Sequence, residues 1–189
     1  MIAPILVDAI LLWGILTKRW SAAVVRMRSI QNPSERIHPL MHIPVPWIFI
    51  LTYLVGVSLQ LLFPLTVDSA EVLLICRVAG IVLTIGGALL AFSGLGIFRA
   101  AHTTTVPFET PAQLITRGPY RFTRNPMYVG LTLIYLGVSG LQVQIWPVLV
   151  LPLLLSYIHR VVIPVEEARL RETFGEAYER YCARVHRWI

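Results

Sequence analysis

The sequence predicts an all-α, polytopic membrane protein, and three observations favour this class. The chain of 189 residues is 56% hydrophobic and only 14% charged, whereas about a quarter of the residues in a soluble domain are charged. The hydrophobic residues are concentrated in long blocks, which is typical of segments that cross a bilayer. The basic residues gather beside alternate ends of these blocks, as they do in proteins of fixed orientation. At this length we expect a single domain over residues 1–189.

The apolar blocks predict about five membrane helices. Four blocks are present: Ile2–Thr17, Trp47–Leu65, Leu73–Phe98 and Met127–Ile163. The last block is too long for one span, because about 20 residues cross the hydrocarbon core. Its only polar interruption lies at residues 140–144, where we expect a tight hairpin between two helices. Pro147 suits the first turn of the second of these helices, and Pro152 is expected to kink it or free a carbonyl group.

The charges predict an N-terminus outside and a C-terminus in the cytoplasm. Basic residues follow the first, third and fifth expected helices, whereas the connections after the second and fourth carry none. Cytoplasmic loops are enriched in Lys and Arg, and only Arg77 departs from this pattern. No basic residue precedes the first block, while Lys18 and Arg19 follow it. This order is opposite to that of a cleavable signal peptide, so we expect a retained first helix.

The net charge of +6 and the isoelectric point near 9.8 do not indicate nucleic-acid binding. The basic clusters lie beside apolar blocks, and this placement favours contact with anionic membrane lipids. Cys76 and Cys182 lie far apart in the sequence and form neither a disulfide framework nor a CxxC metal site. We therefore expect chemistry that requires no metal and no redox partner.

The connection before the fourth apolar block contains a dense polar motif, residues 114–128. Gly118, Pro119 and Pro126 fix turns, and Pro126 suits the first position of a helix. Free backbone N–H groups and Arg124 beside this helix start favour the binding of an anion such as a carboxylate or a phosphate. The alternative is that the arginines only follow the orientation rule and that the tyrosines belong to an interfacial aromatic belt.

Two adjacent acids, Glu166 and Glu167, follow the last apolar block. Acids are unexpected at the C-terminal end of a helix, and either carboxylate suits ribose hydroxyls or the positive charge of a sulfonium. Alternatively, they begin a tail helix, where acids suit the first turn. Residues 166–188 predict this amphipathic tail helix. Its expected apolar face contains Leu170, Phe174, Ala177, Tyr178 and Tyr181.

Together the two motifs resemble the isoprenylcysteine carboxyl methyltransferase family, and the related phospholipid N-methyltransferases share the general pattern. The resemblance covers about residues 98–189, and five helices agree with small prokaryotic members. The matching residues are Gly118-Pro119-Tyr120, Arg124-Asn125-Pro126, Tyr128, Gly130, Glu166-Glu167, Leu170, Phe174-Gly175, Tyr178 and Tyr181. The resemblance implies an enzyme of the prokaryotic cell membrane that transfers a methyl group from S-adenosylmethionine. Its acceptor is expected to be lipophilic or small, with a carboxylate, thiol or amine as the methylated group.

The resemblance also implies that residues 1–97 form membrane helices, and that residues 98–189 contain the cofactor-binding motif, the helical hairpin and the C-terminal tail. The cofactor residues are expected to be Ala112, Gln113, Leu114, Ile115, Tyr120, Arg124, Asn125, Pro126, Met127, Tyr128, Glu166 and Glu167. The usual histidine of the family is Asn125 here, which does not titrate near neutral pH. A substrate-binding arginine of the eukaryotic enzymes corresponds to Val162. His102, His159 and Arg160 are the polar candidates for the acceptor side, and we expect His102 and Arg160 to be catalytic.

Two other functions stay open at this point. The first is an NADPH-dependent membrane reductase of the steroid 5α-reductase type, which has a similar motif, although Val129-Gly130 and the glutamate pair fit a methyltransferase better. The second is a helical membrane scaffold or small transporter without enzymatic activity. The soluble methyltransferase fold is excluded, because the sequence has neither alternating strand and helix patterns nor a glycine-rich turn after a strand. The acceptor and the oligomeric state also stay open.

Overall fold

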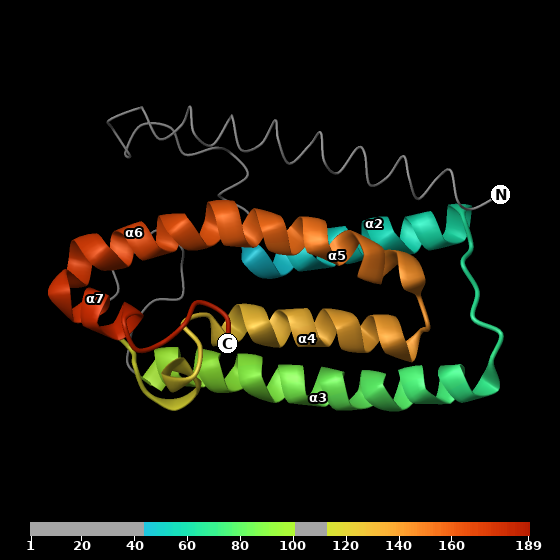
Figure 1. The fold of residues 1–189 in the computed structure, drawn as a ribbon, viewed down its shortest axis with the longest axis horizontal. Coiled ribbons are helices and arrows are strands. Elements are labelled where there is room, and N and C mark those ends of the chain that lie inside the picture. Colours follow the sequence, from blue (N-terminus) through green and yellow to red (C-terminus); the bar gives the residue numbers. More distant parts are fainter. Residues whose placement is uncertain (1–43, 101–112) are drawn as a thin grey trace. The chain divides into compact units, whose positions relative to one another are not determined.

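A computed structural model describes residues 44–100 and 113–189, and every regular element in these two ranges is helical. The first expected apolar block, His102 and Ala112 lie outside the described residues. The long helices pack in two pairs, α3 with α4 and α2 with α5 (Figure 1). The elements are α2 (Val45–Leu62), α3 (Ala70–Ala100), the 3₁₀ turn η2 (Gly118–Arg121), α4 (Pro126–Leu141), α5 (Ile145–Tyr157), the π-helical segment η3 (Ile158–Val162), α6 (Ile163–Phe174) and α7 (Glu176–Cys182).

The helix boundaries confirm the predicted hairpin and the role of Pro126. Helix α4 begins at Pro126 and ends at Leu141, and α5 begins at Ile145 after a three-residue turn. Three helical segments are long and apolar enough to cross a membrane, namely Val45–Leu62, Ala70–Ile97 and Ile145–Phe174. Helix α4 is also apolar, but its 16 residues span only about 24 Å. The fold class is therefore all-helical in the described ranges, with three candidate spans.

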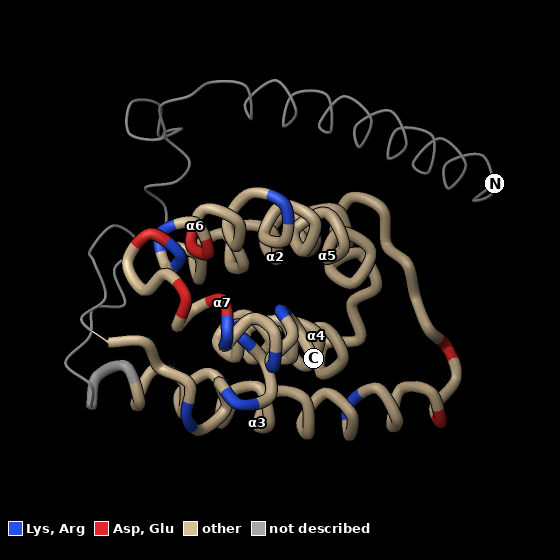
Figure 2. Tube along the Cα trace, turned by 60° about the vertical axis from the view of Figure 1, so that its left-hand side comes forward, with Lys and Arg blue, Asp and Glu red and all other residues tan. Residues whose placement is uncertain are grey.

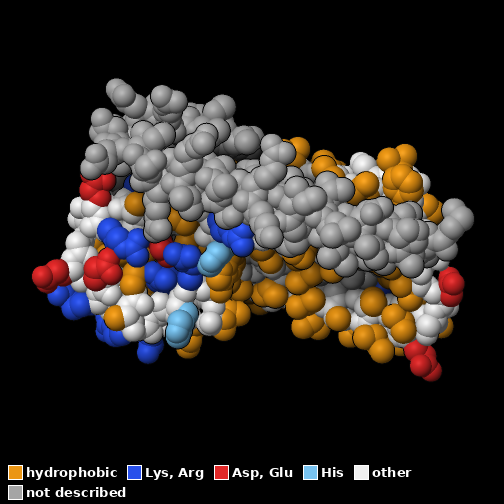
Figure 3. Space-filling model, turned by 45° about the horizontal axis from the view of Figure 1, so that its top comes forward, with side chains coloured by type: hydrophobic (Ala, Val, Ile, Leu, Met, Phe, Trp, Pro, Cys, Tyr) orange, Lys and Arg blue, Asp and Glu red, His pale blue; other side chains and the backbone are white. Residues whose placement is uncertain are grey.

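The surface of these helices suits a lipid environment. Large hydrophobic side chains such as Leu61, Leu74 and Phe92 are 65% to 80% exposed. Such a continuous apolar exterior is unfavourable in water but matches the hydrocarbon of a bilayer. Charged residues gather instead around α6 and α7 (Figures 2 and 3). Two further acids, Asp68 and Glu71, lie at the N-terminal end of α3.

Helices α3 and α4 meet backbone against backbone through glycines. A Cβ atom placed on Gly87 would lie 2.6 Å from the carbonyl oxygen of Gly130, and one on Gly130 would lie 2.7 Å from the carbonyl oxygen of Gly87. Seven residues earlier, a Cβ on Gly80 would lie 2.7 Å from the carbonyl oxygen of Gly137. This contact is the close approach that small residues permit between membrane helices. It aligns the beginning of α4, where the polar motif lies, with the far end of α3.

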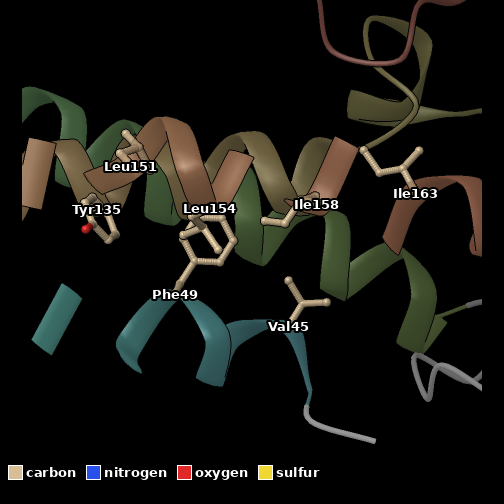
Figure 4. Packing of buried hydrophobic residues seen from close by; sticks show 7 residues of the cluster. All are labelled: Val45, Phe49, Tyr135, Leu151, Leu154, Ile158 and Ile163. Atoms are coloured by element: carbon tan, nitrogen blue, oxygen red, sulfur yellow. The ribbon is translucent and has the colours of Figure 1, made fainter. Parts of the chain in front are cut away.

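Hydrophobic packing joins the second helix pair to the first. Val45 and Phe49 extend from α2 toward Leu154 and Ile158 (Figure 4). The Tyr135 ring of α4 meets Phe49 edge-on, with 6.4 Å between the ring centroids. The buried members of this cluster are Val45, Phe49, Tyr135, Leu151, Leu154, Ile158 and Ile163. The cluster therefore fixes α5 and α6 against α2 and α4.

A π-helical segment lies between the membrane helix α5 and α6. The Ile163 N–H donates to the carbonyl oxygen of Ile158, five residues earlier, instead of the usual four. Pro164 follows directly and has no N–H to continue the α-helical pattern. An inserted residue of this kind rotates all that follows along the helix, and π-helical turns are frequent at functional sites. The segment therefore sets the direction in which the glutamate pair of α6 faces.

The tail differs from the single helix expected over residues 166–188. Helix α6 ends at Phe174, and α7 begins at Glu176. Gly175, which separates them, has a φ of 48°, a conformation that suits glycine and ends a helix. Four of the expected apolar residues nevertheless pack together with Leu114, whereas Ala177 is exposed. These four are Leu170, Phe174, Tyr178 and Tyr181.

We predict that Gly87→Ala destabilises the protein, whereas Gly86→Ala does not. The added methyl group at position 87 collides with the backbone of α4, while a Cβ at Gly86 meets nothing within 4 Å. Overpacking costs about 1–3 kcal/mol, and both substitutions gain the same helix propensity. Thermal unfolding in detergent measures the difference. Equal melting temperatures for the two variants would contradict the close contact of α3 with α4.

Candidate active site

Four parts of the chain meet near the beginning of α4: the turn η2, the first turns of α4 and α6, and the C-terminal residues 183–189, here called the C-terminal segment. Proline fixes two of these starts, since Pro126 opens α4 and Pro164 lies in the first turn of α6. Many of the Lys, Arg, Asp and Glu positions of the described chain lie around α6 and α7 in Figure 2. The site is therefore built from segments that are distant in sequence and held at defined helix ends.

A tyrosine and a carboxylate lie in contact across this site. The Tyr128 hydroxyl of α4 donates a hydrogen bond of 2.5 Å to Glu166 Oε1 of α6. Among the described residues, no Lys, Arg or His nitrogen lies within ion-pair distance of Glu166, and the charge of Arg169, three residues later on α6, acts on it only from beyond that distance. A partly buried carboxylate without a contacting cation is costly unless a ligand or a proton compensates its charge. This site therefore favours a positively charged ligand.

Tyr120 adds a second aromatic ring beside this pair. The ring is buried, and its backbone carbonyl oxygen accepts a hydrogen bond of 2.8 Å from the Tyr181 hydroxyl. The Tyr120 hydroxyl lies beside Gly94 of α3, since a Cβ at that position would be in van der Waals contact with it at 3.6 Å. Burial raises the pKa of Tyr120 well above its usual value, and the charges of Tyr181 and Glu166 raise it further. The phenol therefore stays neutral and offers an aromatic face next to a carboxylate.

The second glutamate has the opposite surroundings. The Glu167 side chain is only 5% exposed, and Arg187 binds it with two nitrogens at 2.7 and 2.9 Å. Arg124 and Arg171 add ion pairs of 3.2 and 3.7 Å. The hydrogen bond to Glu167 raises the pKa of Arg187. Three guanidinium groups thus compensate one buried carboxylate, which leaves it little capacity to bind a ligand.

Hydrogen-bond donors at the start of α4, where the sequence predicted an anion site, bind carbonyl oxygens of the C-terminal segment instead. The Arg124 backbone N–H donates to the carbonyl oxygen of His186 at 2.9 Å, and the Asn125 side-chain amide donates to the carbonyl oxygen of Arg187 at 2.8 Å. The Thr123 hydroxyl donates to the same Arg187 oxygen at 3.3 Å. The expected anion site at the start of α4 therefore has protein carbonyl groups in place of a ligand.

The remaining expected site residues are spread around the motif. Ile115 and Pro126 are buried, Leu114 packs against Tyr178 and Tyr181, and Gln113 is exposed. Met127 packs near Gly94. Leu114, Ile115, Pro126 and Met127 are the apolar members of this group, whereas Gln113 is polar and faces outward.

Of the expected acceptor residues, His102 lies outside the described residues, and His159 and Arg160 form no hydrogen bond or ion pair with Tyr128 or Glu166. Arg160 is exposed on η3, and Val162 packs against the hydrophobic cluster of Figure 4. His159 accepts a hydrogen bond of 3.1 Å from the Trp188 indole at Nδ1.

Four residues of this site were missed by the sequence reasoning: Cys182, His186, Arg187 and Trp188. Cys182 accepts a hydrogen bond from the Arg124 guanidinium. Arg171 was detectable, because it lies four residues after Glu167 on one helix face. Arg187 lies 20 residues away beyond a helix break, and no periodicity connects the two positions.

Comparison with known proteins identifies relatives of this chain. A family model described as phospholipid methyltransferase matches residues 75–177, a range that contains Tyr120, Tyr128 and Glu166. Two rice proteins, from Oryza sativa subsp. indica and subsp. japonica, are each named probable protein-S-isoprenylcysteine O-methyltransferase. Each is 33% identical over 85 residues, or 45% of this chain and 44% of the relative. The chain thus matches less than half the length of these curated relatives. No solved structure matches the chain.

We predict that Glu167→Gln loosens the C-terminal segment, whereas Glu179→Gln has little effect. Removing one partner of a buried ion pair costs about 3–5 kcal/mol. Because Arg171 and Arg187 are 46% and 28% exposed, we expect a loss of about 2 kcal/mol. The Glu179 carboxylate pairs with Arg171 at 59% exposure, and such pairs contribute about 0–1 kcal/mol. Thermal unfolding and protease cleavage near residue 187 measure both effects; equal protection of the two variants would contradict this role.

Proposed function

The chain belongs to the phospholipid methyltransferase family, and on this basis we propose that it is an S-adenosylmethionine-dependent methyltransferase of the membrane. The observation that supports this most directly is the pair of adjacent glutamates with opposite surroundings. Glu167 is paired with three arginines, while Glu166 forms no ion pair with a described residue, accepts a hydrogen bond from the Tyr128 hydroxyl and has only the positive charge of Arg169 acting on it from a greater distance. We propose that the Glu166 carboxylate faces the positive charge of the cofactor.

The residues beside Glu166 suit a sulfonium group. A carboxylate attracts the positive charge directly, and the faces of Tyr120 and Tyr128 attract it through their ring quadrupoles. When bound, S-adenosylmethionine supplies an activated methyl group on a sulfonium that becomes a neutral thioether after transfer. Aromatic and aliphatic side chains around such a group exclude water, which strengthens the attraction between the fixed carboxylate and the cation.

Other residues of the motif have supporting roles in this proposal. Tyr128 holds the Glu166 carboxylate in one orientation through its hydrogen bond. Arg124, Asn125 and Glu167 fix the C-terminal segment against the start of α4. We propose that Ala112, Gln113, Leu114, Ile115, Pro126 and Met127 border the remainder of the cofactor. Alignment of donor and acceptor is the main task of the protein, because the cofactor already carries the activated group.

We propose a lipophilic acceptor that reaches the site from the bilayer. The rice relatives are named for an isoprenylcysteine substrate, and the exterior of the described helices is apolar. Asn125 does not titrate, and its amide is bound to the backbone. An acceptor that is already an anion, such as a carboxylate or a thiolate, needs no general base. Arg160, which is exposed on η3, and His102 are the proposed residues on the acceptor side.

The proposed topology places this chemistry at the cytoplasmic interface. Five membrane helices with the N-terminus outside put α6, α7 and the C-terminal segment in the cytoplasm of a prokaryotic cell, as one domain over residues 1–189. The three candidate spans and the apolar helix α4 support this arrangement. In this proposed topology the arginines of α6, α7 and the motif are cytoplasmic, as the positive-inside rule predicts.

We predict that Glu166→Gln weakens S-adenosylmethionine binding about tenfold or more, since a charge-assisted contact contributes about 1.5–3 kcal/mol. Tyr128→Phe keeps the ring and loses the hydrogen bond, and we expect a smaller effect. Glu172→Gln, an exposed position on the same helix, is the matched control. Calorimetric titration of the detergent-purified protein measures all three. Tight NADPH binding without a response to S-adenosylmethionine would instead indicate a reductase.

We also predict that membranes containing the protein transfer labelled methyl groups to an extractable lipophilic product. Label released by mild base indicates a methyl ester, and stable label indicates a thioether or a methylamine. Incubation with methyl-labelled cofactor followed by solvent extraction and mass spectrometry measures the product. Membranes with Glu166→Gln serve as the control. Label that appears only in water-soluble products would overturn the lipophilic acceptor.

A further inference from the structure

A concave surface lies where the turn η2 meets the end of α7. It is a pocket of about 250 Å³ lined by Thr116, Arg121, Tyr181, Arg184 and Val185. Neither Tyr128 nor Glu166 lines it, so this arginine pocket is distinct from the proposed cofactor site. Its lining contains two guanidinium groups and no acid.

The two arginines of the pocket are not neutralised by the described residues. Arg121 forms no hydrogen bond or ion pair with another described side chain, and Arg184 contacts only the carbonyl oxygen of Arg180 at 3.2 Å. The tail glutamates with ion pairs are bound to other arginines, namely Glu167 to Arg124, Arg171 and Arg187, Glu176 to Arg180, and Glu179 to Arg171. Two like charges in one pocket repel each other and attract an anion.

The chemistry of the lining favours a phosphate. Guanidinium groups bind phosphate oxygens with two parallel hydrogen bonds, and the hydroxyl of Thr116 supplies a further donor. Burial raises the pKa of Tyr181 to about 12, so its phenol adds no negative charge to the pocket. The pocket therefore offers donors and positive charge together.

The position of the pocket favours a phosphate that belongs to a lipid. Arg121 and Phe122 lie four to five residues before Pro126, where the apolar helix α4 begins. The headgroup region occupies about 5–7 Å on each side of the hydrocarbon core. Phe122 is 76% exposed, which is unfavourable in water and favourable at the membrane interface. An exposed aromatic ring next to a basic pocket matches the boundary between headgroups and acyl chains.

We propose that the arginine pocket binds the phosphate group of a membrane phospholipid, with Arg121 and Arg184 contacting the phosphate oxygens and Phe122 lying in the adjacent lipid. This site is separate from methyl transfer and does not depend on the proposed function. Its occupant holds the turn η2 and the end of α7 at the depth of the headgroups. The cofactor site next to them is thereby kept at the interface where a lipophilic acceptor arrives.

Native mass spectrometry of the protein in a neutral detergent tests this proposal. The probes are dioctanoyl phosphatidylglycerol, dioctanoylglycerol, which lacks the phosphate, and inorganic phosphate. We expect Arg121→Gln combined with Arg184→Gln to weaken phosphatidylglycerol binding about tenfold or more. Arg180→Gln removes one charge from α7 outside the pocket and is the matched control for each single variant, Arg121→Gln and Arg184→Gln; we expect it to change binding by less than about twofold.

Several outcomes overturn the proposal. Equal weakening by Arg180→Gln indicates attraction to overall charge, and unchanged binding in the double variant excludes these two arginines. Equal binding of dioctanoylglycerol assigns the interaction to apolar surface, and competition by inorganic phosphate at equal concentration assigns the pocket to a soluble anion. Both arginines are exposed, and each single variant is measured together with its melting temperature. S-adenosylmethionine binding is measured on the same samples, so that failure of either proposal is detected separately.

Discussion

The buried carboxylate of Glu167 is the constraint on which the functional end of the molecule depends. Desolvation of a carboxylate is tolerated only where cations surround it closely, and here Arg124, Arg171 and Arg187 do so. These arginines come from the polar motif, from α6 and from the C-terminal segment. Compensation of one charge therefore brings together three parts of the chain. Glu166, one residue earlier on α6, faces a different direction and contacts Tyr128.

The close contact of α3 with α4 supplies the second constraint. Glycines at a seven-residue spacing let the two backbones approach directly, so the start of α4 is fixed relative to α3. Tyr120 then lies beside Gly94, and Tyr128 lies in the first turn of α4. The π-helical segment η3, which directly precedes α6, sets the direction in which the two glutamates of α6 face. The geometry of the site thus depends on backbone contacts in the membrane helices as well as on its own charges.

Local features of the fold were predictable from the sequence, whereas contacts across the chain were not. The hairpin after Leu141 and the start of α4 at Pro126 follow from composition and from proline chemistry. The break at Gly175 was missed because the apolar spacing continues across it. The seven-residue spacing of Gly80 and Gly87 is visible in the sequence and favours a close helix contact, but it does not identify α4 as the partner. The pairing of Glu167 with Arg187 was not predictable, and neither were the hydrogen bonds from Arg124 and Asn125 to carbonyl oxygens of residues 186 and 187. These contacts form only because the C-terminal segment folds back against the start of α4.

The arginines explain why composition alone was ambiguous about function. All of those in the polar motif, α6 and α7 follow the distribution that the positive-inside rule predicts for a cytoplasmic face, and this explanation is sufficient for each one alone. Their contacts divide them into groups with different tasks: Arg124, Arg171 and Arg187 compensate Glu167, Arg180 pairs with Glu176, and Arg121 and Arg184 line a pocket without an acid. A residue that sets topology is therefore still available for structure or binding. The surroundings of each charge, and not its presence, distinguish these tasks.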